Sequence, residues 1–201
     1  MRQQTYDNVA RLDEKYHGYI KTTDLLSEGL TNRQIAQLQL EGYLDKISNG
    51  YFWLSKSRLE KPWDYKAVEV GFVNENAVVI AGSACYYQGL IKEEPPILSI
   101  ATRRSDRHKM KFPFSVSRHY FAEDMFESDM KSVQTEFGSY RIYSIDRSVC
   151  DCIRFREDLE DHIFDLVIEN YQKKYADERR RERMLTYARM MKFEEKARRV
   201  L

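Results

Sequence analysis

The sequence has 201 residues, of which 42% are hydrophobic and 32% are charged. This composition is ordinary for a soluble chain, and the length suits one large domain or two small ones. No apolar run approaches the roughly 20 residues of a membrane-spanning helix, and the N-terminus lacks the pattern of a signal peptide, so we expect a cytoplasmic protein. An odd, sparse set of cysteines is no disulfide framework, and we expect buried thiols at Cys85, Cys150 and Cys152.

The net charge of +1 results from an uneven distribution of charged residues. Residues 172–201, the basic tail, contain eleven Lys and Arg but five Asp and Glu, whereas residues 1–171 contain 22 basic and 27 acidic side chains. Within this acidic part lies a basic island, opposed only by Asp106 and formed by Arg103, Arg104, Arg107, Lys109, Lys111 and Arg118. Clustered positive charge can mark an anionic partner, although a solvated helix face explains the basic tail about equally well.

The first elements predicted in chain order are a helix over 5–16, an extended link at 19–20, helices over 24–28 and 31–41, and strands over 43–47 and 51–54. Thr31 with Gln34 three residues later has the capping-box pattern of a helix start. Asn49-Gly50 is a strong signal for a hairpin between the two strands. This order predicts a winged helix-turn-helix over residues 1–60, with an expected core of Leu12, Ile20, Leu25, Leu26, Leu30, Ile35, Leu38, Leu44 and Leu54.

The rest of the chain, residues 61–201, is expected to form a second domain after the polar stretch from Lys56 to Pro62. Its predicted elements are a helix that begins at Pro62, a strand over 77–80, a helix over 83–90, strands over 97–101, 114–116 and 140–145, and helices from Asp146 almost to the end. The fold class expected for the whole chain is therefore α/β of the α+β kind. It combines the winged helix with a short sheet and a helical C-terminal bundle.

A helix-turn-helix places the N-terminal residues of its second helix in the major groove of DNA. Arg can hold guanine with two hydrogen bonds, and Asn or Gln can hold adenine in the same way, while the helix start and the wing can contact phosphates. The candidate DNA-binding residues are Thr31, Asn32, Arg33, Gln34, Gln37, Lys46, Ser48 and Asn49. The alternative is a solvated surface that the domain uses for protein contacts.

The predicted DNA-binding domain is electrically neutral, because residues 1–60 contain eight basic and eight acidic side chains. Phosphate contacts usually dominate the affinity of a protein for DNA, so such a domain should bind weakly alone. Either the basic groups of this domain cluster on one face, or the basic island and the basic tail assist in binding DNA. The basic island is accordingly a candidate secondary contact to nucleic acid or to a partner.

An enzymatic site is not expected. Gly82-Ser83 after an apolar strand resembles the start of a nucleotidyltransferase site, which needs an Asp-x-Asp or Asp-x-Glu pair to hold magnesium. The next predicted strand, 97–101, contains no carboxylate, and no triad order, zinc motif or phosphate loop is present. We therefore expect no catalysis, no metal and no cofactor.

Two stretches of the sequence together resemble the AbiEi-type antitoxins of bacterial type IV toxin–antitoxin systems. The first runs from Gly18 to Tyr51 and resembles the winged helix of that family. The second combines residues 80–90 with residues 144–156, where Arg147, Ser148 and Asp151 stand in the positions of the family's Arg-Thr-x-x-Asp motif. The resemblance covers nearly the whole chain and departs from the motif at Ser148.

The resemblance implies a repressor that binds inverted repeats in the operator DNA of its own operon. It also implies a C-terminal domain that counters a nucleotidyltransferase toxin in abortive infection, an antiviral defence, in that family typically without a stable complex. Arg147 and Asp151 match motif positions, but their spacing also suits a structural ion pair, which we favour. The alternative function is a winged-helix transcriptional regulator whose second domain binds a ligand or a protein, with no toxin partner.

Overall fold

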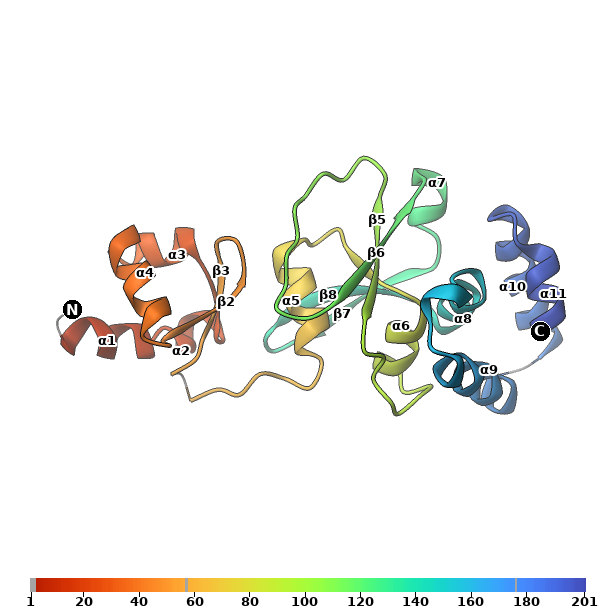
Figure 1. Ribbon diagram of the computed structural model, residues 1–201, viewed down its shortest axis with the longest axis horizontal. Helices are drawn as coiled ribbons and strands as arrows, with labels where there is room; N and C mark the ends of the chain where they lie inside the picture. Colours follow the sequence, from red (N-terminus) through yellow and green to blue (C-terminus); the bar gives the residue numbers. More distant parts are fainter. Residues whose placement is uncertain (1–2, 57, 176) are drawn as a thin grey trace. The chain divides into compact units, whose positions relative to one another are not determined.

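The computed structural model describes residues 3–56, 58–175 and 177–201 (Figure 1). The chain divides into two compact units: unit 1 comprises Met1–Asn74, His108–Pro113 and Gln134–Ser139, and unit 2 comprises Glu75–Arg107, Phe114–Val133 and Tyr140–Leu201. Helices and two small sheets make the chain an α+β protein. The predicted domain boundary after residue 60 stays a prediction. Parts of the predicted N-terminus, linker and basic tail lie outside the described residues, namely Met1, Arg2, Ser57 and Ala176.

Unit 1 contains mainly helices and a three-stranded sheet. Its elements are α1 Gln3–Ala10, α2 Asp13–Tyr16, β1 Tyr19–Lys21, α3 Thr22–Ser27, α4 Asn32–Leu40, β2 Leu44–Ser48, β3 Tyr51–Leu54 and α5 Tyr65–Val73. The strands are antiparallel in the order β1-β3-β2. The predicted hairpin is confirmed, because Ser48 pairs with Tyr51 across Asn49-Gly50 and Gly50 has a φ of +82°. The predicted helix over 5–16 is divided into α1 and α2, with Arg11 and Leu12 in a turn between them.

The core of unit 1 follows the helical spacing of the sequence. It is formed by Val9, Ile20, Leu25, Leu30, Ile35, Leu38, Leu44, Phe52 and Leu54. Leu26 was expected in this core but is 42% exposed. Leu25 takes the inward position of α3, and the next residue lies about 100° further round the helix. Ile35 and Leu38 hold one side of α4 against the core, which turns the opposite side of that helix to solvent.

An aromatic cluster covers part of the three-stranded sheet. The rings of Tyr19 and Trp53 lie 4.8 Å apart, and Phe72 of α5 lies 5.5 Å from Tyr19. Phe137 lies 6.4 Å from Trp53, so the segment Gln134–Ser139 joins the same cluster. Gly18 lies close beside it with a φ of +82°, and a Cβ atom there would lie 2.2 Å from Trp53 Cζ3. Only glycine therefore fits at this position.

Unit 2 is built on a mixed five-stranded sheet. Its elements are β4 Val78–Val79, α6 Ala81–Tyr87, β5 Leu98–Arg103, β6 Val116–Phe121, α7 Glu123–Phe126, β7 Met130–Thr135, β8 Gly138–Tyr143, α8 Ile145–Arg154, a 3-10 turn Arg156–Asp158, α9 Asp161–Tyr175, α10 Glu178–Met190 and α11 Glu194–Val200. The strand order is β6-β5-β4-β8-β7, with β4 antiparallel to β5 but parallel to β8. The end of β7 and the start of β8 lie in the segment Gln134–Ser139, which belongs to unit 1. Helix α7 and strand β7 were not predicted from the sequence, because their residues have little apolar periodicity.

Helix α8 is the centre of unit 2 and contacts α6, α9, α10 and α11 (Figure 1). Every residue from Asp146 to Ile153 is buried. The predicted burial of the three cysteines is confirmed, and the sulfur atoms of Cys85 and Cys152 lie 3.9 Å apart. Burial raises the pKa of the Cys150 thiol, which keeps it protonated and unreactive. The polar groups of α8 must likewise find their partners inside the protein.

Candidate functional site

The start of α4 is fixed by the predicted capping box. The Thr31 Oγ1 atom accepts a hydrogen bond from the backbone N–H of Gln34 at 3.3 Å, and Gln34 Oε1 accepts from the backbone N–H of Thr31 at 2.8 Å. The Thr31 hydroxyl also donates to Gln34 Oε1 at 2.9 Å. The Oε1 atom of Gln34 is therefore used within the helix start, and the base contact predicted for this residue stays a prediction.

Four exposed residues form one outward row on α4, which we call the α4 stripe: Arg33, Ala36, Gln37 and Leu40. Their spacing of three and four residues places them one above another on the side opposite Ile35 and Leu38. Asn32 is also exposed and lies beside this row in the first turn. Arg33 forms no ion pair or side-chain hydrogen bond with any described residue. The helix thus presents a free guanidinium group from a capped first turn.

The amide of Gln37 is oriented by a neighbouring carboxylate. Gln37 Nε2 donates a hydrogen bond of 2.6 Å to Glu41 Oε1. Hydrogen bonds from Tyr6 and Gln37 lower the pKa of Glu41, so this carboxylate stays ionised, and the bond to Glu41 raises the pKa of Tyr6 to about 12. Gln37 Oε1 and its second N–H have no partner among the described residues. Both a donor and an acceptor therefore remain available on the α4 stripe.

The β2–β3 hairpin presents two of its three predicted contact residues to solvent. Lys46 and Asn49 are exposed, but Ser48 is 3% exposed, which differs from its predicted place on an open wing. The Ser48 Oγ atom instead accepts a long hydrogen bond of 3.5 Å from the backbone N–H of Lys111. The exposed side chains of Lys109 and Lys111 consequently belong to unit 1, the same compact unit as α4.

Arg103 and Arg118 of the basic island are neutralised by carboxylates of unit 2. Arg103 pairs with Glu123, Nε to Oε1 2.6 Å, and also with Glu127. Arg118 lies 3.4 Å from a carboxylate oxygen of Asp106 and donates a hydrogen bond of 2.8 Å to Thr102 Oγ1. The expectation that only Asp106 opposes the island is therefore wrong, because Glu123 and Glu127 lie outside its sequence window.

Arg104 and Arg107 of the basic island are exposed. Arg107 Nη1 donates to the backbone oxygen of Arg104 at 3.1 Å, and neither side chain pairs with a described carboxylate. These two cations lie in unit 2, whereas Lys109 and Lys111 lie in unit 1. The exposed charge of the island is thus divided between the two units.

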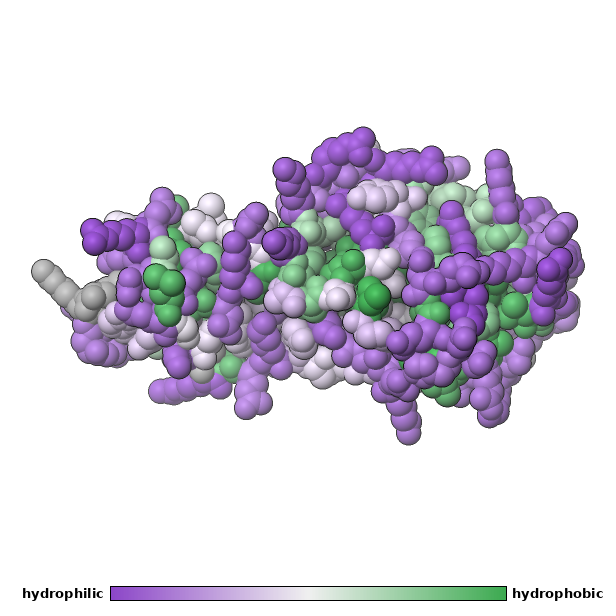
Figure 2. Space-filling view, in the orientation of Figure 1, coloured by the Kyte–Doolittle hydropathy of each residue, from purple (hydrophilic) through white to green (hydrophobic). Residues whose placement is uncertain are grey.

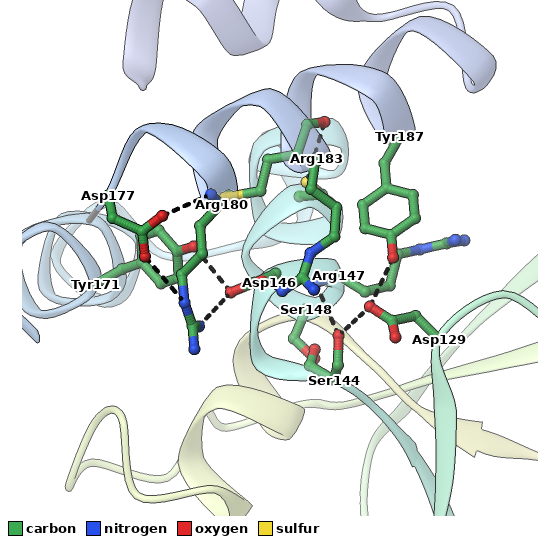
Figure 3. Close-up of polar contacts among 12 residues, drawn as sticks. Asp129, Ser144, Asp146, Arg147, Ser148, Tyr171, Asp177, Arg180, Arg183 and Tyr187 are labelled. Atoms are coloured by element: carbon green, nitrogen blue, oxygen red, sulfur yellow. Dashed lines mark hydrogen bonds and ion pairs between the residues drawn. The ribbon is translucent and has the colours of Figure 1, made fainter. Parts of the chain in front are cut away.

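A polar network at the start of α8 attaches α10 to the rest of unit 2 (Figure 3). Asp146 is 1% exposed and accepts hydrogen bonds from Tyr171 of α9 at 2.8 Å, from Arg180 at 2.9 Å and from Arg183. A buried carboxylate needs such charged partners. The role of Asp146 was not predicted from the sequence, because its partners lie 25 to 37 positions away.

A second carboxylate, Asp129, adds a contact between the strand region and α10. Its Oδ2 atom accepts hydrogen bonds from Tyr187 at 2.6 Å and from Ser144 at 2.7 Å (Figure 3). Although partial burial disfavours the charged form, these bonds and the nearby arginines lower the pKa of Asp129. The Ser144 Oγ atom also caps α8 by accepting from the backbone N–H of Arg147. Asp129 and Asp146 therefore both bind side chains of α10.

The predicted pair of Arg147 and Asp151 lies inside unit 2, where both side chains are 0% exposed and Nε lies 3.5 Å from Oδ2. Arg147 Nη2 donates to the backbone oxygen of Met125 at 3.2 Å, and its guanidinium carbon lies 4.6 Å from the centre of the Tyr143 ring. Burial raises the pKa of Asp151 to about 6, against the lowering effect of Arg147 and Arg154. The pair has the geometry of the structural ion pair that the spacing indicated.

Several arginines of the basic tail form ion pairs with carboxylates of unit 2. Arg180 and Arg183 bind Asp146, while Arg189 and Arg198 both bind Glu194, whose pKa these hydrogen bonds lower to about 2. Four exposed cations of the tail form no ion pair with a described residue: Lys174, Arg179, Lys192 and Arg199. Hydrophilic residues cover most of the face shown in Figure 2.

The described residues contain neither a cluster of metal ligands nor a membrane-spanning helix. In residues 3–56, 58–175 and 177–201, no group of three or more His, Cys, Asp or Glu side chains could hold a metal ion. No helix in the described part of the chain combines the length and the apolar character needed to cross a bilayer.

The fold of the chain is similar to that of a solved structure, whereas comparisons of sequence find no match. No protein family model matches the chain, and no curated protein sequence matches it. Among solved structures, the chain is similar to the RV2827C protein from Mycobacterium tuberculosis, with a TM-score of 0.60 and 13% identity over 100% of this chain and 82% of that one. At this identity the likeness shows a shared α+β fold and carries no information on activity.

Proposed function

We propose that unit 1 is a winged helix-turn-helix that binds duplex DNA at specific sequences, and that the protein acts as a transcriptional repressor. The observation that carries this proposal is the α4 stripe, in which Arg33 and Gln37 project from a capped helix. In this assignment α3 and α4 are the two helices of the motif, and the β2–β3 hairpin is the wing. Gly29, with a φ of +85°, forms the tight turn between the helices.

Each polar residue of the stripe has a base that matches its hydrogen-bonding groups. Arg33 would donate two hydrogen bonds to O6 and N7 of guanine, and Gln37 would bind N6 and N7 of adenine. Asn32 is exposed in the first turn and would contact a base edge or a phosphate, and the exposed residue Thr31 precedes it. An α-helix fits the major groove, which is about 12 Å wide. The rigid start of α4 would limit the entropy lost on binding.

Lys109 and Lys111 add positive charge to unit 1, in which residues 1–60 have no net charge. The segment His108–Pro113 belongs to unit 1 and adds two exposed cations beside the hairpin that carries Lys46 and Asn49. Cations at such positions would contact phosphates, which set the register of a protein on DNA without reading its sequence. We therefore assign the phosphate contacts to these lysines and the base contacts to α4.

The direct test compares Arg33→Ala with Arg11→Ala in the full chain, on a duplex selected by the protein from a random pool. Arg11 is an exposed arginine of unit 1 outside α4, so both variants lose the same charge. Arg33→Ala should weaken binding to the selected duplex by about 5- to 150-fold and binding to unrelated DNA much less. An equal loss for both variants, or an equal loss on both DNAs, would contradict base reading by Arg33.

The resemblance to AbiEi-type antitoxins extends the proposal to the operon. We propose that the DNA site is an inverted repeat upstream of the protein's own gene, and that unit 2 counters a nucleotidyltransferase toxin encoded beside it. Co-expression tests the second part, because the protein should restore growth to cells that express the toxin and Arg33→Ala should still do so. If the wild-type protein does not restore growth, the result favours the alternative, a winged-helix regulator whose unit 2 binds a ligand or another protein.

A further inference from the structure

The α4 stripe combines polar and apolar side chains in a regular order. Ala36 and Leu40 occupy two of its four positions, and Leu40 is 82% exposed, more than any other exposed large hydrophobic residue of the described chain. Residues four apart on a helix are neighbours, so the two apolar side chains lie side by side. Arg33 and Gln37 lie next to them on the same face. Exposure of this apolar pair to water does not stabilise the fold, so its position calls for another explanation.

The dimensions of the stripe match the spacing of base pairs. A helix rises 1.5 Å per residue, so Arg33 and Leu40 are separated by about 10 Å along the axis. Base pairs are stacked at about 3.4 Å, and the stripe can therefore face about three successive pairs. Arg33 would lie at one end of this row, and the apolar pair would face the base pairs toward the other end.

The chemistry of the apolar pair favours a base edge over a phosphate or a protein partner. Aliphatic side chains such as those of Ala36 and Leu40 offer no hydrogen bond or charge to a phosphate. A stable protein interface buries about 800 Å² on each partner, whereas one leucine and one alanine between Arg33 and Gln37 offer a small apolar area. In the major groove the 5-methyl group of thymine is the one apolar feature that distinguishes a base pair.

We propose that Ala36 and Leu40 are specificity-determining residues that contact the 5-methyl groups of thymines in the DNA site. The preferred half-site then contains thymine within three base pairs of the guanine held by Arg33. The proposal rests on the proposed DNA-binding function of unit 1 and adds the class of base that the apolar half of the stripe selects.

Substitution of thymine by deoxyuridine tests the proposal, because it removes the methyl group and preserves base pairing. The full chain is measured on the duplex it selects from a random pool, with each thymine replaced in turn. At one or two positions, the wild-type protein should bind about four-fold more weakly, the value expected for one buried methyl-sized group. L40A should lose the sensitivity at its own position and keep it at the position that faces Ala36. L26A, which truncates an exposed leucine outside the stripe, is the matched control and should keep both.

The outcomes separate this proposal from the proposed function. If no duplex is selected, or if Arg33→Ala has no effect, DNA reading by α4 fails. If Arg33→Ala weakens binding but deoxyuridine does not, or if L40A retains the full sensitivity to deoxyuridine, the thymine contact is refuted while DNA reading stands. If L40A instead converts a dimer to a monomer in sedimentation, Leu40 serves a contact between copies of the chain and the proposal is overturned.

Discussion

Substitution of Asp151 by asparagine tests whether burial or ion pairing dominates inside α8. The carboxylate lies 3.5 Å from Arg147 Nε, and both side chains are 0% exposed. Neither Asp151 oxygen has a hydrogen-bond partner among the described residues, and burial raises the pKa of Asp151 to about 6 although Arg147 and Arg154 lower it. The desolvation of the charge therefore outweighs its attraction to arginine. Asparagine has the shape of the protonated carboxyl group and cannot ionise.

The sign of the pH effect follows from the two pKa values of Asp151. In the unfolded chain an aspartate titrates near pH 3.9, below its value of about 6 in the folded protein. The folded state therefore binds the proton more tightly, and the stabilising contribution is complete below about pH 4 and is lost as the pH rises through 6. The full effect is about 3 kcal/mol, of which about 2 kcal/mol is lost between pH 4.5 and 7.5.

The distribution of cysteine and tryptophan makes the two units separately measurable. All three cysteines are buried in unit 2, whereas both tryptophans, Trp53 and Trp63, belong to unit 1. Labelling with a thiol reagent that reacts at acid pH, across a urea series, reports the unfolding of unit 2. Between pH 4.5 and 7.5 the unfolding free energy of wild type should fall by about 2 kcal/mol relative to Asp151→Asn. Tryptophan fluorescence should show no such difference.

Taking the difference between the two proteins cancels the titration of every other group. Asp165→Asn, which removes an exposed carboxylate of α9, is the control for the loss of one charge. The opposite result is that wild type becomes more stable relative to Asp151→Asn as the pH rises. It would show that the attraction of the Asp151 carboxylate to Arg147 exceeds the free-energy cost of burying its charge. A difference that does not change with pH would equally refute the reasoning.

Two further predictions concern unit 1. Thr31→Ala should lower the unfolding free energy of unit 1 by about 1 kcal/mol, because the α4 cap is lost. The assay is tryptophan fluorescence across a urea series, in which Thr31→Ser should retain most of the stability. Equal stability of Thr31→Ala and wild type would contradict the capping role. Lys109→Gln with Lys111→Gln should reduce the salt dependence of DNA binding by about two units of slope, whereas Lys192→Gln with Lys196→Gln in the basic tail should leave it unchanged. A slope unaffected by the first pair would place the segment His108–Pro113 away from the DNA.

The sequence by itself determined the features that depend on residues within a few positions of one another. The capping box of Thr31 and Gln34, the turn at Asn49-Gly50 and the inward positions of Ile35 and Leu38 were all predicted correctly. Helix caps, tight turns and helical periodicity are local, since each is decided by backbone hydrogen bonds and side-chain spacing over three or four residues. The α+β class follows from the same local signals.

Only the tertiary structure decided which charged and polar groups remain free. Ser48 was expected at the surface, yet its hydroxyl accepts a hydrogen bond from Lys111, 63 positions away. Arg103 of the basic island is neutralised by Glu123 and Glu127, and the tail cations Arg180 and Arg183 by Asp146. Composition counts these charges but cannot pair them, because a charge is available to a ligand only where the path of the chain leaves it without an opposite charge nearby.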